Sequence, residues 1–225
     1  MKEYIISKKR KNQMLIGEDE ISEGLYNVVF GGVILYGFLI NILLVLFFSN
    51  MFENIDVEIL SIFMLAGGLI SILMVGFSKN AIISFLGFSL LSISLGCELA
   101  AIVSRYEIIE IKVALIATIV IVIVMMTLGY CFPSIFQSMG KGLFIILLLD
   151  VICTVIFGLI FDLEIVILSF IGVIIFSLYV AYDWVNANDC KKTINNAIFS
   201  ACDLYLDILN LFLSILKIVD FLSDD

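Results

Sequence analysis

The chain has 225 residues, of which 63% are hydrophobic and only 15% are charged, and its formal net charge is −9. Soluble domains contain roughly 45–50% apolar and 25% charged residues, so this composition excludes an ordinary water-soluble domain. The negative charge, with no basic patch beyond the N-terminal segment, excludes a nucleic-acid-binding protein.

Seven apolar runs are each long enough to cross a bilayer, which takes about 17–25 residues of α-helix. They are Val28–Phe48, Ile59–Phe77, Ala81–Ser104, Val113–Phe132, Leu143–Phe161, Ile165–Tyr182 and Ala197–Val219. The connections between them are short, so the chain is predicted to form one compact domain. We therefore expect an all-α integral membrane protein: a seven-transmembrane-helix bundle over residues 25–219, an N-terminal tail (1–24) and a short acidic C-terminal tail (220–225).

Basic residues predict the orientation of this bundle. If the N-terminus is cytoplasmic, nine basic residues lie inside (Lys2, Lys8, Lys9, Arg10, Lys11, Lys79, Lys141, Lys191 and Lys192) and three outside (Arg105, Lys112 and Lys217). That bias follows the positive-inside rule for seven crossings. The outside segments are acidic, and they either raise the local concentration of cations or are ordinary solvated loops; their acids are Glu53, Asp56, Glu58, Glu107, Glu110, Asp162, Glu164, Asp220, Asp224 and Asp225.

Small residues recur at four-residue spacing in the run that begins at Ala81. Ser92, Gly96, Ala100 and Ser104 would form a ridge that a neighbouring helix can approach closely. Gly67, Gly68 and Gly76 offer a weaker version of the same device in the preceding run.

Five acidic residues lie within or at the edge of the apolar runs: Glu98, Asp150, Asp183, Asp203 and Asp207. A charged group in hydrocarbon costs at least about 2.5–3.5 kcal/mol, so such residues usually have a function. Each could instead cap a helix end or bond a neighbouring hydroxyl group. The chain contains no histidine, and its five cysteines show no metal-site or disulfide spacing. Any response to pH near neutrality is therefore expected to come from carboxyl groups.

The last apolar run carries a stripe of polar residues at steps of three and four: Asn196, Ser200, Asp203, Asp207, Asn210, Ser214 and Lys217. On an α-helix this spacing places all of them on one face. Because two carboxyl groups on that face cannot be presented to lipid, the stripe is predicted to face other helices or water inside the bundle. The last helix would then line a site or a path.

Asp183 and Asp207 are expected to meet. The midpoint between them is Asn195, and a reversal of the chain there would bring them to similar depth on adjacent antiparallel helices. Two carboxyl groups a few ångströms apart in a dry site share a proton, which makes the pair a pH-responsive gate. Calcium suits such a gate transiently because it takes oxygen ligands in flexible geometry. Candidates for the ion path are Asp203, Asn210, Glu98 and Asp150.

Tyr182-Asp183 and the stretch Leu204-Tyr205-Leu206-Asp207-Ile208-Leu209-Asn210-Leu211-Phe212-Leu213 resemble the transmembrane Bax inhibitor motif (Bax inhibitor-1-like) family. Tyr26-Asn27-Val28-Val29, Leu35-Tyr36-Gly37 and Ser84-Phe85-Leu86-Gly87 are similar to its earlier segments. The resemblance implies a bacterial plasma-membrane protein with the last of seven helices central and a proton-sensitive calcium leak gated by Asp183 and Asp207. The chain departs from it in lacking a basic residue in Ile59–Phe77, where an arginine latch is implied, and in carrying Asp203 as an extra acid.

The leading hypothesis is thus a pH-sensitive calcium leak that needs the lipid bilayer and no cofactor. A non-conducting regulator of membrane proteases or of cell-death and stress partners, and a proton-coupled cation transporter, stay open as alternatives. An intramembrane aspartyl protease is disfavoured, because Asp207 follows Leu204-Tyr205-Leu206 where such enzymes have Gly-x-Gly, so we expect no enzymatic activity. A topology with six crossings and a re-entrant last segment also stays open.

Overall fold

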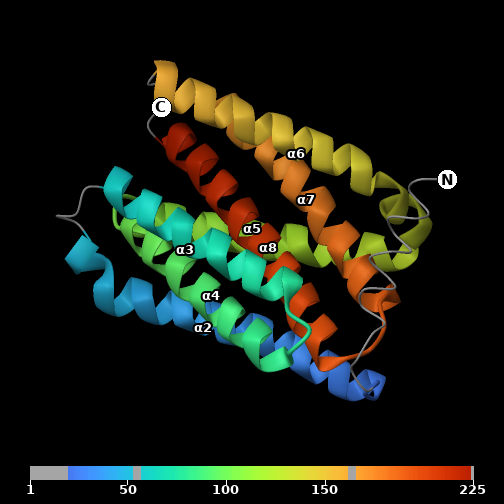
Figure 1. Cartoon of the computed structure of the whole chain (residues 1–225). Helices are drawn as coiled ribbons and strands as arrows, with labels where there is room; N and C mark the ends of the chain where they lie inside the picture. The colour runs from blue at the N-terminus through green and yellow to red at the C-terminus, as the bar shows by residue number, and fades with distance from the viewer. Residues whose placement is uncertain (1–19, 53–56, 162–165, 224–225) are drawn as a thin grey trace. The chain divides into compact units, whose positions relative to one another are not determined.

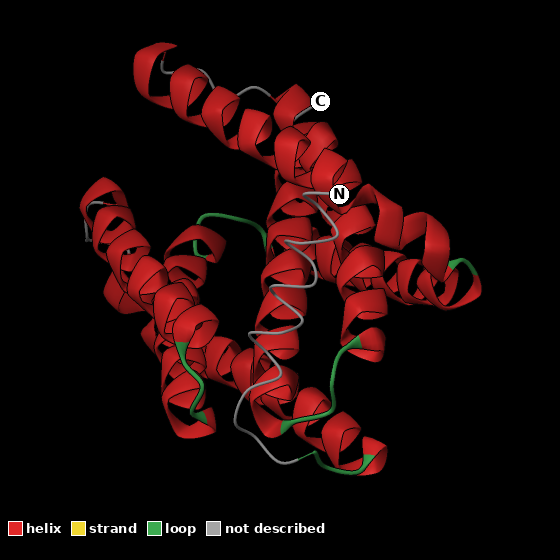
Figure 2. Cartoon of the chain, turned by 45° about the vertical axis from the view of Figure 1, so that its right-hand side comes forward, coloured by secondary structure: helices red, strands yellow, loops and turns green. Residues whose placement is uncertain are grey.

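The computed structural model describes residues 20–52, 57–161 and 166–223. Seven α-helices make up this part of the chain (Figure 1), and it contains no strand (Figure 2). They are α2 (Glu23–Phe52), α3 (Val57–Phe77), α4 (Ala81–Val103), α5 (Ile108–Cys131), α6 (Pro133–Phe161), α7 (Val166–Asp189) and α8 (Ile194–Ser223). The prediction of an all-α fold is confirmed.

Local sequence signals start several of these helices. The side chain of Asn80 accepts a hydrogen bond from the second N–H of α4, and Glu107 and Glu110 form a capping box at the start of α5. Pro133 is the first residue of α6, where its missing N–H leaves no bond unmade. Thr193 caps α8, its hydroxyl oxygen accepting a 3.1 Å hydrogen bond from the N–H of Asn196.

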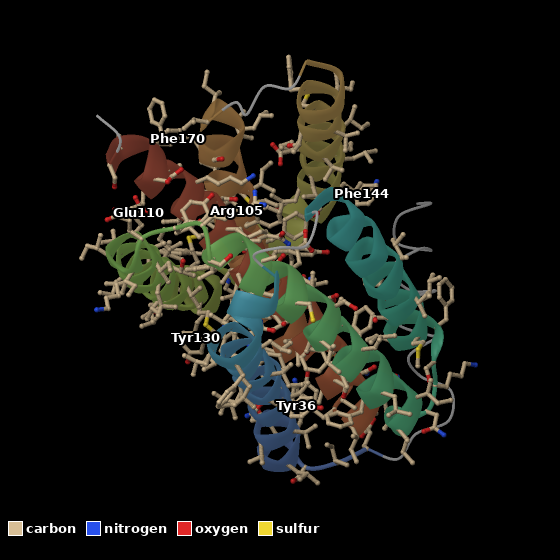
Figure 3. The ribbon with its side chains drawn as sticks, turned by 90° about the vertical axis from the view of Figure 1, so that its left-hand side faces the viewer. Tyr36, Arg105, Glu110, Tyr130, Phe144 and Phe170 are labelled. Atoms are coloured by element: carbon tan, nitrogen blue, oxygen red, sulfur yellow. The ribbon has the colours of Figure 1, made fainter. Side chains whose placement is uncertain are left out.

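The helices place apolar side chains on the outside. Large hydrophobic residues are exposed along α2, α4, α5, α6 and α7; three of them, Tyr130, Phe144 and Phe170, are labelled in Figure 3. These five helices are long and apolar enough to cross a membrane. Meanwhile polar residues such as Asn41 and Thr118 are buried. This reverses the arrangement of a soluble protein, and it identifies a multi-pass helical membrane protein.

The five candidate spans correspond to five of the seven predicted runs. In α3 the apolar helix Ala66–Phe77 is shorter than a full span, and the side chains of residues 48–65 lie outside the described part of the chain. So do the predicted tail up to residue 19 and the acids of 53–56, 162–165 and 224–225. Helix α8, which contains the predicted run Ala197–Val219, is not among the helices apolar enough to cross a membrane by composition. It runs without interruption from Ile194 to Ser223, which argues against a segment that turns back within the membrane.

The helices form two compact units. The first contains α2, α3, α4 and the segment Asp189–Cys202, which includes the beginning of α8. The second contains α5, α6, α7 and the remainder of α8 from Asp203.

Small residues set the spacing within the first unit, as predicted for the ridge on α4. A Cβ atom at Gly96 would lie 2.8 Å from the side-chain oxygen of Asn41 on α2, and one at Gly67 would lie 2.6 Å from the Ser94 hydroxyl oxygen. Ser92 and Ala100 are fully buried. Ser104 does not belong to this ridge: it is exposed and bonds its own helix at Ala101.

Tyr26 joins the α7–α8 turn to α2 in the same unit. Its side chain is buried, and its hydroxyl group lies 3.2 Å from both Cys190 Sγ and Ser200 Oγ. The Lys192 ammonium group sits 4.4 Å from the centre of the Tyr26 ring, a cation–π contact. Asn195 accepts a 2.6 Å hydrogen bond from Ser84 Oγ on α4 and donates one of 3.2 Å to the carbonyl oxygen of Ser78, the residue after α3.

Glycines also allow close approach within the second unit. A Cβ atom at Gly129 of α5 would lie 3.0 Å from the Ala181 carbonyl oxygen on α7. One at Gly172 of α7 would lie 2.7 Å from Ser214 Oγ on α8. Beside these contacts, Phe136, Ala181 and Val185 form a buried apolar cluster. Helix α7 is therefore held at short range against its neighbours, which limits how far its side chains can move.

Candidate functional site

The polar stripe of α8 lies inside the protein over most of its length. Asn196, Ser200 and Asp207 are buried, and Asp203, Asn210 and Ser214 are half-buried. Lys217 is exposed, so the predicted stripe ends one turn earlier than its spacing suggests. Most of the other residues of α8 are apolar. The stripe therefore holds the side chains of this helix that could bind an ion or exchange a proton.

Asp183 of α7 and Asp207 of α8 lie next to each other. The turn between the two helices spans residues 190–193, before the predicted reversal at Asn195, which lies inside α8, so Asp183 is fewer residues from the turn than Asp207 is. Their side chains share a hydrogen bond, and Asp207 is only 7% exposed. A carboxylate can only accept hydrogen bonds, so a bond between two of these groups requires a proton on one of them. The contact is compatible with the predicted sharing of one proton, which stays a prediction.

One oxygen of the pair has no partner. Asp207 Oδ2 is buried and makes no hydrogen bond with any described residue, which leaves Oδ1 for the contact with Asp183. Asp203, one turn earlier on α8, adds a further negative charge that acts on Asp207. Two acids, Asp183 and Asp203, therefore act on Asp207, although no group of three or more His, Cys, Asp or Glu residues in the described chain is arranged to hold a metal ion.

The remaining predicted site residues lie elsewhere. The Asn210 amide donates to the Leu206 carbonyl oxygen of its own helix at 2.9 Å. Glu98 is half-buried on α4, in the first unit. Asp150 is half-buried on α6, and its Oδ1 is buried without a hydrogen-bond partner among the described residues. Of the predicted site residues, Asp183 and Asp203 are therefore the ones shown to act on Asp207.

Sequence reasoning missed Tyr179, a tyrosine that acts on the pair, and gave Tyr182 no role beyond the family resemblance. Tyr179 of α7 lies within electrostatic range of both Asp183 and Asp207. Its ring meets that of Tyr182 edge-on, with the ring centres 6.2 Å apart. A signal for Tyr179 was present, because it stands one helical turn before Asp183 and so on the same face.

The sequence matches the family Bax1-I, described as the inhibitor of apoptosis-promoting Bax1, over residues 20–224. The chain belongs to this family. Its members are generally non-enzymatic membrane proteins with ion-leak and regulatory roles. The resemblance stated from Tyr182-Asp183 and the stretch around Asp207 is confirmed.

Two proteins to which this chain is similar are bacterial. A protein of Helicobacter pylori strain ATCC 700392 / 26695 is 42% identical over 88 residues, which cover 39% of this chain and 37% of that protein. One from strain J99 / ATCC 700824 matches to the same extent. Both are described as uncharacterized proteins, and the chain matches little more than a third of their length.

Proposed function

We propose that this Bax1-I protein is a pH-sensitive cation leak across the membrane, with calcium as the favoured permeant ion. The observation that carries the proposal is the contact between the half-buried Asp183 and the buried Asp207 inside a multi-pass membrane protein. Family membership supports an ion-leak role in general terms.

The gate follows from the chemistry of two acids at one place. With one proton between them, the two side chains hold α7 and α8 together and the path stays closed. When the proton leaves, two negative charges in a site shielded from water repel each other, and they become oxygen ligands for a divalent cation. Flux is therefore expected to rise as pH rises. Asp203 and Asn210 are the candidates for the adjoining path on α8, with Glu98 and Asp150 as further candidates.

Calcium entry into proteoliposomes, followed with a trapped fluorescent indicator across a pH series, tests this proposal. Wild-type protein is expected to give flux that rises along a titration curve, by about tenfold per pH unit well below the midpoint, and levels off at alkaline pH. Asp207→Asn is expected to give flux that no longer depends on pH, because asparagine cannot ionise. Protein-free vesicles set the background.

Equal, pH-dependent flux in wild type and Asp207→Asn would exclude the pair as the gate. If neither protein conducts calcium at any pH and a membrane protein co-purifies in fixed ratio, the family's regulatory role is the better explanation. Both proteins are checked for equal reconstitution, so that a loss of flux is not a loss of protein.

The orientation is also part of the proposal: seven crossings of a bacterial plasma membrane with a cytoplasmic N-terminus. It rests on the nine-to-three distribution of basic residues given above. In a variant without native cysteines, Ser223→Cys at the exposed end of α8 is expected to react with an impermeant maleimide added to intact cells. Labelling only after the cells are opened would instead favour six crossings. A cysteine at the exposed Lys79, predicted to be cytoplasmic, is the matched control.

A further inference from the structure

One carboxyl oxygen of the acid pair accepts no hydrogen bond from the described residues. Asp207 Oδ2 is buried and has no hydrogen-bond partner in the described chain. A buried carboxylate without donors is unstable relative to one in water, and the cost grows when the group is fully ionised. Asp183 and Asp203, which both act on Asp207, add negative charge to the site. The ionised pair therefore needs a donor from a nearby side chain.

Tyr179 is placed to supply it. Its phenol group lies on the face of α7 that carries Asp183, one turn away, and it interacts electrostatically with both members of the pair. The Tyr182 ring packs edge-on against the Tyr179 ring and so limits its position. The Tyr182 ring in turn lies against Gly140 of α6. A Cβ atom at Gly140 would lie 2.7 Å from that ring, so only glycine leaves the space for it.

We propose that the Tyr179 hydroxyl group donates a hydrogen bond to the ionised Asp183–Asp207 pair and thereby stabilises its deprotonated form. Tyr179 is a positioning residue for the gate, and its consequence for flux rests on the proposed function. In the protonated arrangement the proton between the carboxyl groups holds them together. When it leaves to the aqueous side, Asp207 Oδ2 takes the phenol donor in its place.

The other groups around the pair do not offer the same donor. On α8, Asp203 is an acid. On α7, the Tyr182 hydroxyl group is turned to Gly140 of α6, whose next residue, Lys141, is exposed. Helix α5 meets α7 at Gly129, where the neighbouring groups are the Ala181 carbonyl oxygen, Val185 and Trp184. The phenol of Tyr179, one helical turn from Asp183, acts on both members of the pair.

The test compares Tyr179→Phe with the matched variant Tyr182→Phe in reconstituted membranes. Two readouts are followed across pH: calcium flux, and the infrared band of protonated carboxyl groups, assigned to the pair by its change in Asp207→Asn. A donor to the charged form favours that form, so its removal is expected to move the midpoint of both curves about one pH unit toward alkaline values. Tyr182→Phe keeps its ring on Gly140 and is expected to leave both midpoints in place.

An infrared midpoint that Tyr179→Phe leaves unchanged would overturn the inference, whatever the flux. Should wild-type protein conduct no calcium, the leak proposal fails while the infrared midpoint still decides the role of Tyr179. If Tyr179→Phe does not fold, Tyr179→Met, which lacks the hydroxyl group but keeps an apolar side chain, is expected to shift the infrared midpoint in the same direction. Equal shifts in the Tyr182→Phe control would also overturn the inference, because they would indicate a general loosening of α7.

Discussion

Replacing either Asp183 or Asp207 with asparagine is expected to abolish the pH response of calcium flux, and replacing both is expected to change it no further. The reason is the proposed sharing of one proton, by which the two carboxyl groups would titrate as a unit. Once one carboxyl group is gone, the other has no partner with which to share that proton. Groups that act together in this way give strongly non-additive effects, with interaction energies of about 0.5–3 kcal/mol.

A double-mutant cycle on flux, measured at the acidic and alkaline limits, checks this expectation. Asp150→Asn is the matched control, since it removes a carboxyl group from an apolar helix of the same unit that does not act on the pair. It is expected to keep the pH midpoint, even if the rate changes. Additive losses from Asp183→Asn and Asp207→Asn would show two independent groups and contradict a shared proton.

Replacing Gly87 with leucine is expected to prevent normal packing of the first unit. A Cβ atom there would lie 2.8 Å from Met74 Cβ and 3.1 Å from the Ser71 carbonyl oxygen, both on α3. The backbone of α3 cannot rotate away as a side-chain tip can, so the two helices must separate. Overpacking of this kind lowers the free energy of unfolding by about 1–3 kcal/mol, and we expect the upper end of that range.

Thermal unfolding in detergent, followed by circular dichroism, measures the effect. Gly76→Leu is the matched control on the facing helix, because nothing lies within 4 Å of a Cβ atom at Gly76. It is expected to be neutral or slightly stabilising, since leucine is a better helix former than glycine. An unchanged melting temperature for Gly87→Leu would show that α3 and α4 do not need the contact.

The acid pair shows what residue spacing alone can predict about a site. Equal spacing about a reversal at Asn195 was the reason to expect Asp183 and Asp207 at one depth. The chain turns earlier, at residues 190–193, and nearer to Asp183, so the residue count alone does not explain why the two side chains interact. The same spacing argument placed Asn210 in the stripe, but its amide bonds the backbone of its own helix. Periodicity assigns a residue to a face, and it does not decide whether the side chain reaches across or folds back.

The sequence by itself determined that this is a helical membrane protein, which of its helices carries the polar stripe, and to which family it belongs. Those properties depend on local composition and on the 3.6-residue period, both of which can be read along one chain. Only the tertiary structure decided that Tyr26 ties the α7–α8 turn to α2, that Asp207 Oδ2 lacks a donor, and that Gly140 seats the ring beside Tyr179. Each of these depends on how one helix is rotated and shifted against another, and that is set by side-chain packing between segments far apart in the sequence.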